Sequence, residues 1–125
     1  MPRGYRLTKS ADFRRAQSQG QCWSDRTLVL CVHPNGLENS RFGFSVSRRI
    51  GKAVARNRNK RLIREVVRMH REMVVPGWDV IFIARRGIVE VDYWAIERSV
   101  LNLLRLAGLL RTEHGNGIGI EEKPN

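Results

Sequence analysis

Two segments, 26–33 and 41–47, show a period of two that predicts β-strands: larger apolar residues at every second position of each segment alternate with smaller or polar ones. The turn residues Pro-Asn-Gly at 34–36 favour pairing of these two strands as a hairpin. A third segment, 78–84, is a nearly continuous apolar run, which is typical of a central strand covered on both faces. We therefore expect a small sheet with segment 78–84 inside it.

Three other segments show the helical period of about 3.6 residues. The first, 11–18, is expected to follow an N-cap at Ser10 and to end at Gly20. The second, 55–74, is the longest, and the third follows a cap at Asp92. The side of the second helix expected to be buried comprises Leu62, Ile63, Val66, Met69, Met73 and Val74. The corresponding side of the third comprises Trp94, Ile96, Val100, Leu101, Leu103, Leu104 and Ala107.

The predicted order is helix, strand, strand, helix, strand, helix, in one domain of residues 1–114 with a flexible tail at 115–125. Because a helix connects strands 41–47 and 78–84, those two strands can lie parallel. Strand 41–47 has an aromatic face expected in the core and a small-residue face that is open to a ligand. The aromatic side holds Phe42, Phe44 and Val46, and the small side holds Gly43, Ser45 and Ser47.

Positive charge is distributed unevenly along the chain. The 125 residues include 23 Lys and Arg against 12 Asp and Glu, a formal net charge of +11. Residues 41–71 hold eleven of the basic residues and a single acid, Glu65, so this segment carries +10 of the total. This concentration on a folded element predicts a polyanionic partner, with nucleic acid as the first candidate and an anionic membrane surface as the second.

Candidate catalytic chemistry is sparse. Acidic residues are scattered, and His33, His70 and His114 fall in different elements, so we find no set suited to activating water. His70 is expected to pack between helices. Cys22 and Cys31 match no metal-ligand spacing and are too few for a disulfide framework, which favours a reducing cytosol. No apolar stretch approaches the ~20 residues of a membrane span, and no secretory signal is expected.

The positive signal is the basic helix with the strand before it, residues 45–65. Arginines one helical turn apart can each bind phosphate oxygens through a forked guanidinium group. Asn57 offers a donor and an acceptor to a sugar or a base edge, and Gly51 permits a tight turn into the helix. The alternative is a solvated helix without a particular ligand, which the one-sided charge disfavours.

This stretch closely resembles the family of bacterial ribonuclease P protein subunits. The family signature is an Arg-Asn-Arg motif extended by Lys-Arg and by a further Arg one turn later, and it reads here as residues 56–64. Residues 43–51 resemble the family's run Gly-x-Ser-Val-Ser-basic-basic-x-Gly. The similarity extends to Arg6-Leu7, to Asp12-Phe13 and to residues 79–85, and it covers about residues 5–108.

The resemblance implies a function that composition does not. The family's protein joins the catalytic ribonuclease P RNA, one protein per RNA, in a cytoplasmic endoribonuclease that removes the 5′ leader of precursor tRNA. The RNA subunit is expected to hold Mg²⁺ and to perform the hydrolysis, so the resemblance implies no catalytic residue, metal or cofactor in this chain. The alternative is a structural RNA-binding protein of the ribosome that uses the same basic helix. The scattered acids disfavour a third hypothesis, a protein-only nuclease.

The resemblance also implies a fold. It is an α+β two-layer sandwich of order α-β-β-β-α-β-α, with a mostly antiparallel sheet, one parallel pair and a left-handed βαβ crossover. This order has one strand more than the pattern above. The additional strand is expected near residues 86–91 or within the connection 34–42.

The resemblance also implies roles for individual residues of this sequence. Phe13 matches an aromatic residue that stacks on the leader, with a core position as the open alternative. The RNA-binding helix comprises Arg56, Asn57, Arg58, Lys60, Arg61, Arg64 and Arg68. The leader-binding cleft comprises Phe13, Gln17, Cys31, Ser45, Ser47, Arg48, Arg49 and Lys52. Gln17 and Cys31 stand where many members carry aromatic residues, which reduces the stacking surface.

Overall fold

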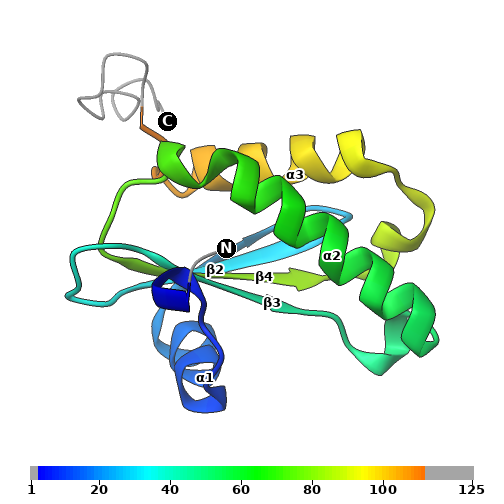
Figure 1. Cartoon of the computed structure of the whole chain (residues 1–125), viewed down its shortest axis with the longest axis horizontal. Coiled ribbons are helices and arrows are strands. Elements are labelled where there is room, and N and C mark those ends of the chain that lie inside the picture. The colour runs from blue at the N-terminus through cyan, green and yellow to red at the C-terminus, as the bar shows by residue number, and fades with distance from the viewer. Residues whose placement is uncertain (1–2, 112–125) are drawn as a thin grey trace.

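A four-stranded sheet separates helices on its two faces in the structure (Figure 1), a computed structural model that describes residues 3–111. Helices α2 and α3 cover one face, and α1 lies against the other. The strands are β1 (Gln21–Ser24), β2 (Leu28–Pro34), β3 (Arg41–Ser45) and β4 (Trp78–Ala84), and the helices are α1 (Ser10–Gln19), α2 (Ala53–His70) and α3 (Tyr93–Leu106). Short 3₁₀ helices lie at η1 (Arg3–Tyr5), η2 (Arg48–Ile50), η3 (Arg71–Met73) and η4 (Arg86–Glu90).

Strand β4 lies inside the sheet, as its apolar run predicts, and the strand order is β1-β2-β4-β3. It pairs antiparallel with β2 and parallel with β3, so the mixed α+β class with one parallel pair is confirmed. The expected hairpin of segments 26–33 and 41–47 is wrong, because β4 separates β2 from β3. A strand that is apolar on both faces is stable only where both its faces are covered and both its edges are paired, and that position lies between the other two.

The additional strand is β1, at the edge of the sheet, where it forms a hairpin with β2. Neither expected location holds it, since residues 86–90 form the 3₁₀ helix η4. Three of the four residues of β1 are exposed, and only Trp23 is half-buried. An edge strand of this kind shows no apolar alternation, which is why the pattern of the chain did not reveal it.

The two faces of the sheet differ as strand 41–47 predicted. Phe42 is buried in the main core beneath α2 and α3, and Phe44 packs against that core from its margin. On the α1 face a smaller cluster contains Leu7, Ala16, Cys31 and Ile81. The face that carries α1 is therefore thinly covered, and this position matters for the site.

Helix boundaries agree with the predicted caps in two of three cases. Gly20 ends α1, and the Asp92 carboxylate accepts a hydrogen bond from the Ala95 backbone N–H (3.0 Å) at the start of α3. Ser10 is the first residue of α1 and not its cap, because Lys9 occupies the N-cap position and makes no side-chain capping bond there.

Helix α2 ends at His70, four residues before the expected boundary, and continues as η3. His70 packs between helices as expected, with Nε2 2.8 Å from Oε2 of Glu97 on α3. The expected burial of Met69, Met73 and Trp94 is wrong, since these side chains are 58%, 43% and 61% exposed. The buried face of α2 instead consists of Asn59, Ile63, Val66 and Val67.

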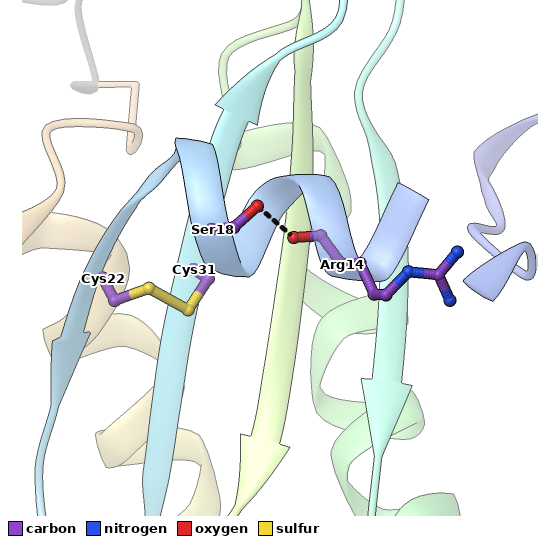
Figure 2. Close-up of a disulfide and its surroundings, with 4 residues drawn as sticks. All are labelled: Arg14, Ser18, Cys22 and Cys31. Carbon is purple, nitrogen blue, oxygen red and sulfur yellow. Dashed lines mark hydrogen bonds between the residues drawn. A yellow bond between two sulfur atoms is a disulfide. The ribbon is translucent and has the colours of Figure 1, made fainter. Parts of the chain in front are cut away.

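Cys22 and Cys31, which are too few for a disulfide framework, form a single disulfide that the sequence did not predict (Figure 2). The two residues are directly opposed in the β1–β2 hairpin, with Cα atoms 4.1 Å apart. Their spacing along the chain does not reveal this pairing, because the hairpin itself was not predicted.

The predicted end of the domain at residue 114 and the predicted tail at 115–125 lie outside the described residues. Within residues 3–111 no helix combines the length and the apolar character needed to cross a membrane.

Candidate nucleic-acid interface

Phe13 projects from α1 onto the backbone of β3. A Cβ atom built at Gly43 would lie 2.7 Å from Cζ of Phe13, so the ring rests where any larger residue would place its side chain. The ring is half-buried, and the remaining part is open to solvent. The absence of a side chain at Gly43 therefore makes room for the Phe13 ring. The ring still remains accessible to a stacking partner.

An ion pair between β3 and β4 also reaches α1. Asp79, which is 2% exposed, accepts hydrogen bonds from Arg41 through Nε (2.8 Å) and Nη2 (2.7 Å). Asn35 donates a third hydrogen bond to the Asp79 carboxylate (3.1 Å). Arg41 also reaches Asp12 on α1, with Nη1 3.8 Å from Oδ2. The hydrogen bond to Asp79 raises the pKa of Arg41, so the guanidinium group stays positively charged.

The sequence placed Arg41 only within the basic segment and did not connect it to Asp79. The two residues become neighbours because the parallel register of β3 and β4 sets them opposite each other. No local signal predicts that register, so this part of the site depends on the assembled sheet.

Next to α1, three side chains form a floor across the sheet. Ser45 of β3 lies opposite Ile83 of β4, and Ile83 lies opposite Val29 of β2. All three are partly exposed. We call this row the floor. Val29 and Ile83 were not among the predicted site residues, although their alternation with core residues of β2 and β4 places them on this face.

Cys31 and Gln17 occupy different environments in this region. Cys31 is 2% exposed, packs in the cluster with Ala16 and is bonded to Cys22, so its side chain offers no surface to a ligand. Gln17 is exposed on α1. Of the two positions that depart from the family's aromatic residues, only Gln17 is available for contact.

The basic residues expected at the cleft edge follow directly after β3. The Ser47 hydroxyl accepts a hydrogen bond from the Arg49 backbone N–H (3.3 Å) and caps η2, whose Ile50 is buried as an anchor. Arg48, Arg49 and Lys52 are all exposed. The turn thus presents three cations at the end of the strand that contributes Ser45 to the floor.

The Arg-rich helix α2 presents a second basic surface. At about 100° per residue, its exposed residues lie opposite the buried face that contains Ile63 and Val66. That face packs into the main core, so the basic side chains lie on the part of α2 turned away from the core. Helix α2 itself lies on the face of the sheet opposite α1 (Figure 1). The exposed members are Asn57, Arg58, Lys60 and Arg61, and Arg64 is partly exposed. We call this set the outer stripe.

Two arginines of the predicted RNA-binding helix make contacts within the protein. Arg56 donates from Nη1 to the Gly51 carbonyl (2.9 Å), which holds the turn into α2. Arg68 forms a forked pair with Glu65, through Nη2 at 2.6 Å and Nε at 3.1 Å. Hydrogen bonding within this pair lowers the pKa of Glu65 and raises that of Arg68. The positive charge of Arg68 is therefore partly neutralised by the Glu65 carboxylate.

Asn59, the residue between the two halves of the basic motif, is buried to 2% exposure. Its amide oxygen has no hydrogen-bond partner among the described residues. Helical periodicity could have found its burial, because it lies four residues before Ile63 on the same face.

The arrangement is suited to binding a strand of nucleic acid. The floor and Phe13 offer apolar and aromatic surface to bases, and the exposed cations offer charge to phosphates. Within the described part of the chain, no group of three or more His, Cys, Asp or Glu side chains is placed to hold a metal ion.

Comparisons with known proteins all point to one family. The family model Ribonuclease P matches residues 1–108. The ribonuclease P protein component of Clostridium kluyveri is 42% identical over 109 residues, covering 86% of this chain and 97% of the relative. That of Alkaliphilus oremlandii is 37% identical over 107 residues, covering 86% and 94%.

Solved structures of relatives share the fold. The Staphylococcus aureus RNase P protein matches with a TM-score of 0.79 at 33% identity, over 86% of this chain and 98% of that one. The Thermotoga maritima RNase P protein matches with a TM-score of 0.73 at 33% identity, over 79% and 94%. Because the family model covers residues 1–108, and relatives covered over almost their whole length are up to 42% identical, the chain belongs to the ribonuclease P protein family.

Proposed function

We propose that this chain is the protein component of ribonuclease P. It joins ribonuclease P RNA in a cytoplasmic ribonucleoprotein that removes the 5′ leader of precursor tRNA, and the RNA supplies the Mg²⁺ sites and the hydrolysis. The observation that carries the leader assignment is the floor, an open row of side chains between the half-buried Phe13 and the basic turn after β3. The relatives reported above are all ribonuclease P proteins, and none supports the ribosomal alternative.

The two basic surfaces suggest a division of roles. The leader lies along the α1 face, where bases stack on Phe13 and phosphates meet Arg48, Arg49 and Lys52. The outer stripe belongs to α2, on the opposite face of the sheet, where it binds the phosphates of the RNA subunit. A single protein then contacts the substrate and the catalytic RNA at the same time.

Reconstitution tests the proposed function. The purified chain is mixed with a bacterial ribonuclease P RNA at low Mg²⁺, and cleavage of precursor tRNA is followed. We expect the protein to stimulate release of the leader. A chain that leaves the RNA's cleavage rate unchanged, or that co-purifies with ribosomal subunits and has no effect on precursor tRNA, contradicts the proposal.

Two substitutions test the leader site. Phe13→Ala removes the stacking ring, and Gly43→Ala places a Cβ where the ring rests. Because stacking of one base contributes about 1–3 kcal/mol, each variant should bind precursor tRNA about 5- to 100-fold more weakly, with little change for mature tRNA. Affinities of both tRNAs for the reconstituted enzyme provide the measurement.

Gly4→Ala is the matched control, because a Cβ at Gly4 meets no atom within 4 Å. It should bind both tRNAs like the unmodified chain. Thermal melting shows whether each variant is folded. Equal losses for precursor and mature tRNA in the folded Phe13 variant would remove this residue from the leader site.

A further inference from the structure

The Cys22–Cys31 disulfide lies on the face of the sheet that carries α1. Cys31 packs with Ala16 and Ile81, whereas its neighbours Leu30 and Val32 belong to the core on the other face. Figure 2 shows the disulfide beside the last turns of α1 near Ser18, with the side chain of Arg14 directed away from it. The bond therefore links β1 to β2 under the helix that also carries Phe13.

The end of α1 depends on the two strands that this bond joins. Gly20 alone connects α1 to β1, and its N–H donates to the carbonyl of Ala16 (3.1 Å). A Cβ at Gly20 would overlap the carbonyl oxygen of Val32 in β2. Helix α1, strand β1 and strand β2 therefore meet at Gly20. A change in the β1–β2 pairing should alter the position of the end of α1.

Without the disulfide, β1 is held by its pairing with β2 and by Trp23, which packs against the margin of the main core. It has four residues and lies at the edge of the sheet, where β2 is its one neighbouring strand. Cys31 as a free thiol would still pack as a small apolar side chain beneath Ala16. Loss of the bond should therefore loosen the end of α1 without unfolding the domain.

We propose that Cys22 and Cys31 form a reversible redox site. Its oxidation state determines how tightly α1, which carries Phe13, packs against the sheet beside the floor. The oxidised form holds the leader site in its binding geometry, and the reduced form lowers affinity for the leader. The functional part of this inference rests on the proposed function. In reducing compartments structural disulfides are rare, and those that form are usually transient or redox-sensing.

The chemistry is thiol–disulfide exchange with a small disulfide such as oxidised glutathione. The Cys22 thiolate attacks that disulfide, forms a mixed disulfide and releases one small thiol. The Cys31 thiolate then attacks Sγ of Cys22, forms the protein disulfide and releases the second small thiol. Two protein thiols are oxidised, one small disulfide is reduced, and the two protons pass to the released thiolates. Reduction reverses these steps. Cys22 is the first site of attack because it is exposed, whereas Cys31 is 2% exposed.

The experiment compares the full chain after treatment with oxidised glutathione and after treatment with dithiothreitol, each reconstituted with ribonuclease P RNA. Partial weakening of one stacking site should lower precursor tRNA affinity about threefold to tenfold in the reduced sample, with mature tRNA affinity unchanged. Amide hydrogens of α1 should exchange faster in the reduced sample. Cys22→Ser should behave like the reduced chain in both treatments, and Gly4→Ala should respond to redox like the unmodified chain.

Mass spectrometry after alkylation reports the state of the thiols independently of RNA. Two free thiols after oxidation, or a mixed disulfide on Cys31 instead of Cys22 at early times, would overturn the redox site. Equal precursor affinity and equal α1 exchange in both states would overturn its coupling to the leader. If neither state stimulates cleavage, the proposed function fails, whereas equal stimulation in both states removes only the redox inference. The unmodified chain supplies these results even if the serine variant does not fold.

Discussion

Replacing Lys60, Arg61 and Arg64 together with alanine is expected to weaken binding to ribonuclease P RNA by about 10²-fold near physiological salt. These residues belong to the outer stripe of α2, which is turned away from the core. Each phosphate contact that is lost also removes the release of a counterion, so the slope of log affinity against log salt should become shallower by about 2 to 3. Arg56 is left in place because its bond to the Gly51 carbonyl is part of the fold.

A variant with the same change in charge provides the control. Arg86, Arg98 and Arg105 are exposed and lie in η4 and α3, outside the outer stripe. Their replacement with alanine should change affinity and salt slope much less. Titrations of the RNA at several salt concentrations measure both quantities. If the two triple variants lose affinity equally, the effect comes from net charge and the outer stripe is not the RNA-binding surface.

Arg41→Met is expected to lower the free energy of unfolding by about 3 kcal/mol, because it leaves the Asp79 carboxylate buried without its ion-pair partner. The value lies at the low end for a broken buried pair, since Asn35 still donates to Asp79. The variant should also loosen α1 through loss of the contact with Asp12 and so weaken the leader site. Denaturant unfolding measures the first effect, and precursor tRNA affinity measures the second.

The double variant Arg41→Met, Asp79→Leu provides the matched comparison. Because it removes both charges, it should recover much of the lost stability, while the weakened contact with α1 remains. The raised pKa of Arg41 gives the dependence on pH. A group whose pKa is raised on folding contributes fully below its unfolded pKa and loses that contribution only as pH rises through the folded value. The part of the difference in unfolding free energy that comes from the Arg41 charge should therefore be constant between about pH 5 and pH 9. A double variant less stable than Arg41→Met would show that the pair is not the source of the loss.

The sequence alone predicted features that depend on neighbouring residues and on periodicity. The ends of α1 and α3 at Gly20 and Asp92, the interior position of β4 and the two faces of β3 all follow from local signals. The basic motif of α2 was also readable, because a helix brings residues three and four apart onto one side without help from the rest of the fold. The resemblance to the ribonuclease P family rested on the same local motifs.

Tertiary structure decided everything that depends on which strands become neighbours. The order β2-β4-β3 replaced a predicted hairpin, and β1 appeared where the residues are mostly exposed. The Cys22–Cys31 disulfide followed from that unexpected strand. Burial likewise depended on the partner surface, which left Trp94 exposed and placed Asn59 inside.

The site itself combines both kinds of information. Phe13 and the basic residues were identified in the sequence, but the seat of Phe13 on Gly43, the Arg41–Asp79 pair and the floor were not. These contacts join residues far apart in the chain. The Arg41–Asp79 pair and the floor form only when β4 pairs in register with its neighbouring strands, and the Phe13 contact forms only when α1 packs on β3. Local chemistry therefore determined which residues are candidates for binding RNA, and strand register decided how they are arranged in space, because register is set by packing of the whole sheet.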